Sequence, residues 1–212
     1  MKKVYFISGL GADKRAFSFL DLSFCEPIFI DWIKPLPKES LPQYALRLGE
    51  QISEPSPVIV GVSFGGMLAT EIAKSDASAK VIIISSNKLK KEFPKILLIG
   101  KYFPAYKWIP TAFLKKAGVF RTLFFGPKKE NQKKIFKQII KDADSNFTKW
   151  AIQSIMLWEN NITVENITHI HGTSDKLLPY KKVKADYTIN GGTHLMVMNN
   201  PEEISDLLKK LI

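Results

Sequence analysis

The 212-residue sequence has a single cysteine and three histidines, and it contains no long run of apolar residues. The lone Cys25 excludes an intramolecular disulfide framework and is typical of a reducing compartment, so we expect a cytoplasmic protein. No stretch approaches the roughly 20 apolar residues of a membrane-spanning helix. The apolar run after Lys2 and Lys3 is broken by Gly9 and Gly11, which favours a strand over a signal peptide.

No internal repeat or low-complexity tract is present, and the length predicts one domain. The 45% apolar and 24% charged content is ordinary for a folded protein. The net charge of +11 is unevenly distributed, because residues 88–149 contain 16 Lys and Arg but 4 Asp and Glu. The remainder of the chain contains 15 basic and 16 acidic residues and is nearly neutral. The basicity therefore belongs to one segment.

Short apolar strands alternate with helical patterns at both ends of the chain. The pattern predicts strands at 4–7, 27–30, 58–62, 80–84, 165–170 and 185–189, and helices at 13–20, 41–52, 67–74, 179–184 and 201–211. Such alternation is typical of a parallel sheet with helices on both faces. Residues 88–160 interrupt it with many aromatic residues and lysines, and prolines at 94, 104, 110 and 127 divide this segment into short helices.

The motif Gly61-x-Ser63-x-Gly65 lies between the third predicted strand and a helix. A strand that turns directly into a helix strains the turn residue and needs small neighbours two positions away on each side. The motif predicts an exposed serine nucleophile, although Ser63 could also merely cap the helix.

A serine nucleophile needs a histidine base and an acid that orients it. Among the histidines, His194 lies in a glycine-containing loop between the last strand and the last helix and is the candidate base. The pattern places His169 inside a strand as a packed side chain, and it favours a structural hydrogen bond for His171 at the strand's end. The candidate acid is Asp175, just past the carboxyl end of that strand, where ligands gather in parallel sheets.

Alternatives to Asp175 are weaker, and Asp175 itself could be an ordinary helix cap. The pattern places Asp186 at the opposite edge of the sheet, and it favours solvated side chains for Asp142 and Asp144 in the basic segment.

The order Ser63, Asp175, His194, with the motif after the third strand, resembles the α/β-hydrolase family across essentially the whole chain. The resemblance implies a single domain, with a minimal core of about six strands (residues 1–87 and 161–212) and a helical cap or lid (88–160). It also implies that the main-chain N–H groups of Leu10 and Phe64 form the oxyanion hole. Two departures are visible: the usual opening pair of antiparallel strands is missing, and the frequent His-Gly of the oxyanion loop is Ser8-Gly9.

The resemblance implies a cofactor-independent, metal-free serine hydrolase that acts on small-molecule carboxylic esters through an acyl-enzyme. A thioesterase for carrier-linked acyl groups would use the same residues, and a non-catalytic lipid- or membrane-binding protein could share the fold. The lysines of residues 88–160 could be a solvated face, attract an anionic substrate or dock on an anionic membrane. Nucleic-acid binding is not expected, because no recognition motif is present.

Overall fold

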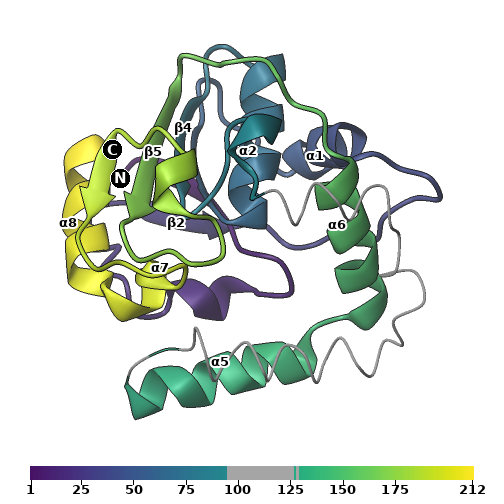
Figure 1. Ribbon diagram of the computed structural model, residues 1–212. Coiled ribbons are helices and arrows are strands. Elements are labelled where there is room, and N and C mark those ends of the chain that lie inside the picture. The colour runs from purple at the N-terminus through teal and green to yellow at the C-terminus, as the bar shows by residue number, and fades with distance from the viewer. Residues whose placement is uncertain (95–126, 128) are drawn as a thin grey trace.

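The computed structural model describes residues 1–94, 127 and 129–212, and a six-stranded sheet lies at its centre (Figure 1). The strands are β1 (Lys3–Ile7), β2 (Glu26–Phe29), β3 (Val58–Val62), β4 (Lys80–Ile84), β5 (Ile167–Gly172) and β6 (Tyr187–Ile189). Their order is β2-β1-β3-β4-β5-β6, and every neighbouring pair is parallel. The predicted α/β architecture with about six parallel strands is confirmed.

Helices cover both faces of the sheet. The described helices are α1 (Leu41–Gly49), α2 (Phe64–Ser75), α5 (Glu130–Asp142), α6 (Ser145–Leu157), α7 (Met196–Asn199) and α8 (Pro201–Leu211), with 3-10 turns η1 (Lys14–Phe17), η2 (Lys90–Glu92) and η4 (Tyr180–Lys182). One apolar cluster joins α1, α2 and α6 to strand residues such as Tyr5 and Ile59. A second cluster joins α7 and α8 to Phe6 and Val60. Alternate side chains of β1 and β3 therefore enter two separate cores.

The strand order reverses direction beside β1. The chain crosses from β1 to β2 on one side and then returns to place β3 on the other side. In open parallel sheets, ligands bind in the crevice outside the carboxyl ends of the two strands that flank such a reversal. The loop after β1 and the turn after β3 meet at this point, which locates the candidate site before any side chain is considered.

Several helix boundaries differ from the sequence prediction. The helix expected at 13–20 is a single 3-10 turn, η1, although Asp13 caps it by accepting the N–H of Arg15. Helix α1 ends at Gly49, and the hydrogen bonds of residues 50–52 then reach back three residues instead of four. The segment predicted as a helix at 179–184 is also only a 3-10 turn, η4, and α7 was not predicted.

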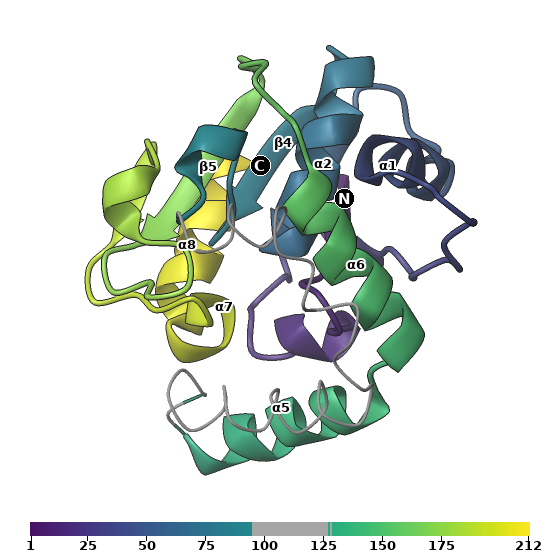
Figure 2. The same cartoon turned by 45° about the vertical axis from the view of Figure 1, so that its right-hand side comes forward.

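The segment between β4 and β5 contains two longer helices, α5 and α6, of 13 residues each. They follow the last of the four prolines in this segment, and the short helices expected between those prolines fall on residues 95–126, outside the described residues. In Figures 1 and 2, α5 lies across from η1 and α7, away from the sheet. None of the helices in the described ranges is both long and apolar enough to cross a membrane.

Candidate active site

Ser63 occupies the turn between β3 and α2 in a strained backbone conformation, with φ 54° and ψ −116°. A non-glycine residue in such a region costs about 1–3 kcal/mol. The flanking glycines are required, because a Cβ on Gly61 would lie 2.5 Å from the carbonyl oxygen of Gly65, and one on Gly65 would lie 2.3 Å from that of Ile7. The Ser63 side chain makes no capping hydrogen bond to α2, so the interpretation of Ser63 as a helix cap is wrong.

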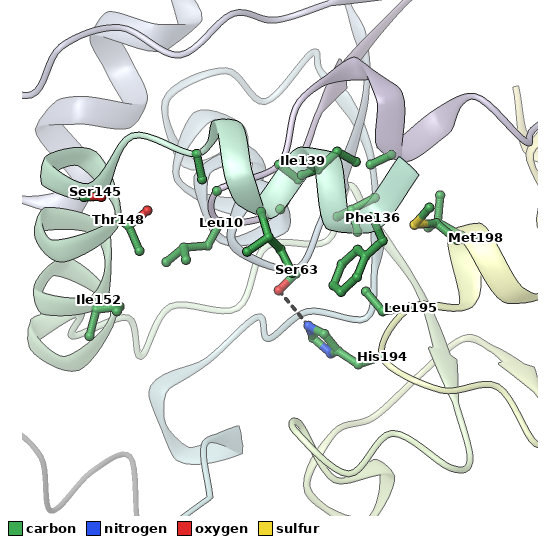
Figure 3. A pocket seen from close by; sticks show the side chains of 18 residues that line it. Leu10, Ser63, Phe136, Ile139, Ser145, Thr148, Ile152, His194, Leu195 and Met198 are labelled. Carbon is green, nitrogen blue, oxygen red and sulfur yellow. Dashed lines mark hydrogen bonds between the residues drawn. The ribbon is translucent and has the colours of Figure 1, made fainter. Parts of the chain in front are cut away.

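Three side chains from distant parts of the sequence form one hydrogen-bonded chain. Ser63 Oγ lies 2.9 Å from His194 Nε2 (Figure 3), and His194 Nδ1 lies 2.8 Å from Asp175 Oδ2. The elements that supply them are the ends of β3, β5 and β6, which lie along one edge of the parallel sheet. Asp175 and His194 are buried, at 4% and 6% exposure. Burial strengthens the electrostatic coupling between them.

The Asp175 carboxylate is held from both of its oxygens. Oδ1 accepts the N–H groups of Leu177 and Leu178 at 2.9 and 2.8 Å, while Oδ2 faces His194. Burial opposes ionisation of Asp175. The hydrogen bond and charge of His194, the Leu178 amide and nearby His171 outweigh it and hold the pKa of the Asp175 carboxyl below its usual value. The carboxylate is therefore ionised at neutral pH and can fix the Nδ1–H tautomer of His194.

The remaining candidates lie elsewhere. Asp186 accepts the backbone N–H of His169 at 2.7 Å and is remote from Ser63 in the sheet. Asp142 and Asp144 are exposed, as expected for solvated side chains, and each also has a protein partner. Asp142 forms an ion pair with Arg15 at 2.8 Å, and the Asp144 carboxylate caps α6.

The loop after β1, residues 8–12, is fixed by two donors that share one acceptor. Ser8 Oγ and Trp32 Nε1 donate to the carbonyl of Ala12 at 2.8 and 2.6 Å. The Ser8 hydroxyl thus helps to fix the loop. The loop passes close to the turn, since a Cβ on Gly9 would lie 3.5 Å from Ser63 Cβ.

A cavity of about 350 Å³ opens above Ser63 (Figure 3). Its walls come from the loop after β1, from α5 and α6, and from the segment around α7. Apolar side chains form most of it: Leu10, Val62, Phe136, Ile139, Ile140, Ile152, Leu195, Val197 and Met198. Of the described residues that line it, His194 is the one ionisable group. A cavity of this size and character accommodates an uncharged, apolar group of a small molecule.

The helix α5 presents different residues to the cavity and to solvent. Phe136, Ile139 and Ile140 line the cavity, whereas Lys134 and Lys137 are exposed on the outer side. Lys134 and Lys137 therefore face away from Ser63. Nowhere in residues 1–94 and 129–212 do three or more His, Cys, Asp or Glu side chains form a group suited to a metal ion.

Some residues around the site have no local signal in the sequence. Trp32 and Arg15 act through partners that lie far along the chain or on a loop whose shape the sequence does not reveal. His171 did have a signal, and the structural hydrogen bond predicted for it is present, between its Nε2 and the carbonyl oxygen of Leu178.

No family model and no curated protein matches the sequence, but solved structures match the fold. A lipase-esterase related protein from Clostridium acetobutylicum aligns with 16% identity and a TM-score of 0.70, covering 100% of this chain and 94% of that chain. A thermophilic esterase from Thermogutta terrifontis aligns with 13% identity and a TM-score of 0.73, covering 99% and 89%. A putative non-heme bromoperoxidase from Mycobacterium tuberculosis aligns with 15% identity and a TM-score of 0.69, covering 100% and 91%. At these identities the likeness establishes the fold, which is that of the α/β-hydrolases.

Proposed function

We propose that this chain, which has the α/β-hydrolase fold, is a serine hydrolase that cleaves carboxylic esters with an apolar acyl group. The observation that carries the proposal is the hydrogen-bonded chain from Ser63 through His194 to Asp175 at the floor of an apolar cavity. The strained backbone of Ser63 adds support, because such strain persists at sites where function requires it. Esterases recur among the solved structures of the same fold.

The reaction proceeds in two steps. Ser63 Oγ attacks the carbonyl carbon of the ester while His194 Nε2 takes the hydroxyl proton, and Asp175 stabilises the imidazolium. The N–H groups of Leu10 and Phe64 hold the oxyanion, and each contributes about 3 kcal/mol to the transition state. His194 returns the proton to the departing alcohol, which leaves an acyl-Ser63. Water then gives a proton to His194 and attacks the acyl carbon, and the carboxylic acid is released.

The chain is one domain in this proposal, with a core of residues 1–87 and 161–212 and a lid of residues 88–160. The lid role follows from α5 and α6, whose apolar side chains form one wall of the cavity over Ser63. The acyl group of the substrate lies against this wall. No metal or organic cofactor takes part in the proposed chemistry.

A fluorophosphonate probe tests the assignment directly, since it reacts with activated serines. We expect the probe to label the wild type and the control variant Ser78→Ala, whose serine is exposed and remote from the site, but not Ser63→Ala. His194→Ala and Asp175→Asn should stay folded and lose turnover of a p-nitrophenyl ester by orders of magnitude. Equal labelling of the wild type and Ser63→Ala would refute the assignment.

Thioester hydrolysis is the second candidate, and the exposed basic side of α5 favours it, because a phosphate-bearing acyl carrier is anionic. Comparing the hydrolysis of one acyl group presented as a carrier thioester and as a simple ester distinguishes a thioesterase from an esterase. A carrier preference that falls steeply with added salt would favour the thioesterase.

A further inference from the structure

Two histidines on β5, His169 and His171, are fully buried beside the acid of the proposed site. Both are 0% exposed, and as alternate strand residues they point to the same face of the sheet. His169 Nε2 lies 3.0 Å from His171 Nδ1, with the two rings nearly perpendicular at 89°. The proposed reaction does not use either ring. Two polar rings buried together therefore require another explanation.

The protons of this pair are fixed by one carbonyl group. His171 Nε2 lies 2.8 Å from the carbonyl oxygen of Leu178, which can only accept, so Nε2 carries the hydrogen. Burial lowers the pKa of His171, so its ring is neutral and Nδ1 must be the acceptor. His169 Nε2 is therefore the donor of their shared hydrogen bond. Burial, with His171 and Lys88 nearby, lowers the pKa of His169 to about 2 and keeps this ring neutral as well.

The same N–H of His171 also faces the proposed triad. His171 Nε2 lies 3.5 Å from Asp175 Oδ2, the oxygen that faces His194, and the side chains of His171 and Asp175 are both at 0% exposure. Leu178 completes a closed arrangement, because its N–H donates to Asp175 Oδ1 while its carbonyl accepts from His171. His171 thus contacts both the carboxylate and the turn that supports it.

We propose that His171 is a positioning residue that holds the Asp175 carboxylate and its Leu177–Leu178 turn in place for His194, and that His169, by donating to His171 Nδ1, reinforces the tautomer that the Leu178 carbonyl sets. The inference rests on the proposed function. No proton moves along this chain: Asp175 stays ionised throughout, and the N–H of His171 stays between Leu178 and Asp175. The other groups that face the pair are the Tyr180 ring, 6.4 Å from that of His171, the Asp186 carboxylate at the His169 backbone, and Lys88.

The test compares His171→Leu, which removes the donor, with His171→Gln, whose side-chain amide can donate from nearly the same position. We expect His171→Leu to lower kcat on the order of 10- to 100-fold, as when the outer partner of a metal-binding histidine or carboxylate is removed, with KM changed less than about twofold. The pH dependence of kcat/KM should also change, because the Asp175 carboxylate that faces His194 loses one of its contacts. His171→Gln should restore both quantities toward the wild-type values.

A second readout does not depend on turnover. The His194 Nδ1–H proton, bonded to Asp175, should give a far-downfield NMR resonance in the wild type and in His171→Gln, and a shifted or missing resonance in His171→Leu. If no ester is hydrolysed but this pattern holds, the proposed function fails and the positioning role stands. If His171→Leu is folded and keeps the resonance and the pH profile, the positioning role is refuted.

If His171→Leu does not fold, His169→Leu and His169→Gln provide the same comparison one step farther from Asp175. Only the glutamine variant keeps a donor for His171 Nδ1. Equal impairment of both, with an unchanged pH profile, would show that the pair serves packing alone.

Discussion

At the scale of single residues, Gly65 is one of the positions in the site that leave no room for a side chain. A side chain on Gly65 would meet the carbonyl oxygens of Ile7 and Ser8 at 2.3 and 2.4 Å, and both are backbone atoms that cannot rotate away. Gly65 therefore allows the end of β1 and the turn after β3 to approach each other. This approach places the loop of residues 8–12 beside the Ser63 hydroxyl.

We expect Gly65→Ala to lower the free energy of unfolding by more than about 2 kcal/mol, because the clash forces the two strand ends apart. Gly49→Ala is the matched control. Its new Cβ would lie 3.6 Å from Ile72 Cγ1, an ordinary contact, and alanine favours the helix in which it lies. Urea unfolding of the three proteins measures the difference. Equal stability of the two variants would contradict the importance of the close approach.

The sequence predicted the residues of the proposed site that carry chemistry better than those that support it. Ser63, Asp175 and His194 each lie after a predicted strand, and parallel strands end at one edge, so their order alone brings them together. The ion pair of Arg15 with Asp142 joins residues 127 positions apart, and no local pattern can signal it. The roles of Leu10 and Phe64 stay predictions.

At the scale of elements, the position of α5 decides the shape of the cavity. The side chain of Gln132, near the start of this helix, donates to the carbonyl of Met198 on α7, and Asp142 at its end pairs with Arg15 in η1. Both contacts attach the helix to segments that also line the cavity or lie next to it. The apolar side of α5 is therefore held over Ser63 from both ends.

We expect Ile140→Trp to shift substrate preference toward short acyl chains, because the larger side chain fills part of the cavity. The ratio of kcat/KM for a long-chain ester to kcat/KM for an acetate ester should be lower in the variant than in the wild type, by about tenfold or more. Gln138→Trp places the same side chain on an exposed position of the same helix and should leave the preference unchanged. A graded series of p-nitrophenyl esters provides the measurement. Parallel profiles for both variants would place the acyl group elsewhere.

Strands were predicted more accurately than helices. The short, buried apolar runs of β1, β3 and β4 lie between two layers of helices, where they form strands. Their predicted bounds agree with the structure to within a residue. Short helical turns such as η1 and α7 were predicted poorly, because a segment of four residues is too short to show the periodicity of a helix. The predicted helix at 41–52 extends three residues beyond the end of α1, because the prediction did not treat Gly49, a poor helix former, as a helix end.

At the scale of the whole molecule, the buried pair of His169 and His171 makes stability depend on pH. Both pKa values are lowered in the folded protein by burial, so the unfolded chain binds more protons below the ordinary histidine pKa of about 6.5. The free energy of unfolding must therefore fall as the pH drops through 6.5. The pKa of Asp175 is lowered too, and its contribution is lost only at more acidic pH.

We expect the free energy of unfolding at pH 5.5 to be lower than at pH 7, by about 1 kcal/mol for His169 and by a further amount of the same sign for His171. In His169→Gln the decrease should be smaller, because one of the two groups no longer titrates. Urea unfolding at the two pH values, with both proteins in the same buffers, measures this difference. The same pH dependence in both proteins would contradict the explanation.

The long excursion between β4 and β5 (residues 85–166) begins and ends with segments that contact each other, residues 88–93 and 158–160. The N–H of Lys90 donates to the carbonyl of Asn160 at 2.8 Å, Asn160 Nδ2 donates to the carbonyl of Lys88 at 2.7 Å, and the rings of Phe93 and Trp158 meet edge to face at 5.9 Å. The two strands that it joins are themselves hydrogen-bonded neighbours. Because the entropy of closing a loop grows only slowly with its length, insertions between these joints that leave the core residues of α6 in place cost little free energy. Such changes would alter the wall over Ser63 without disturbing the register of the sheet.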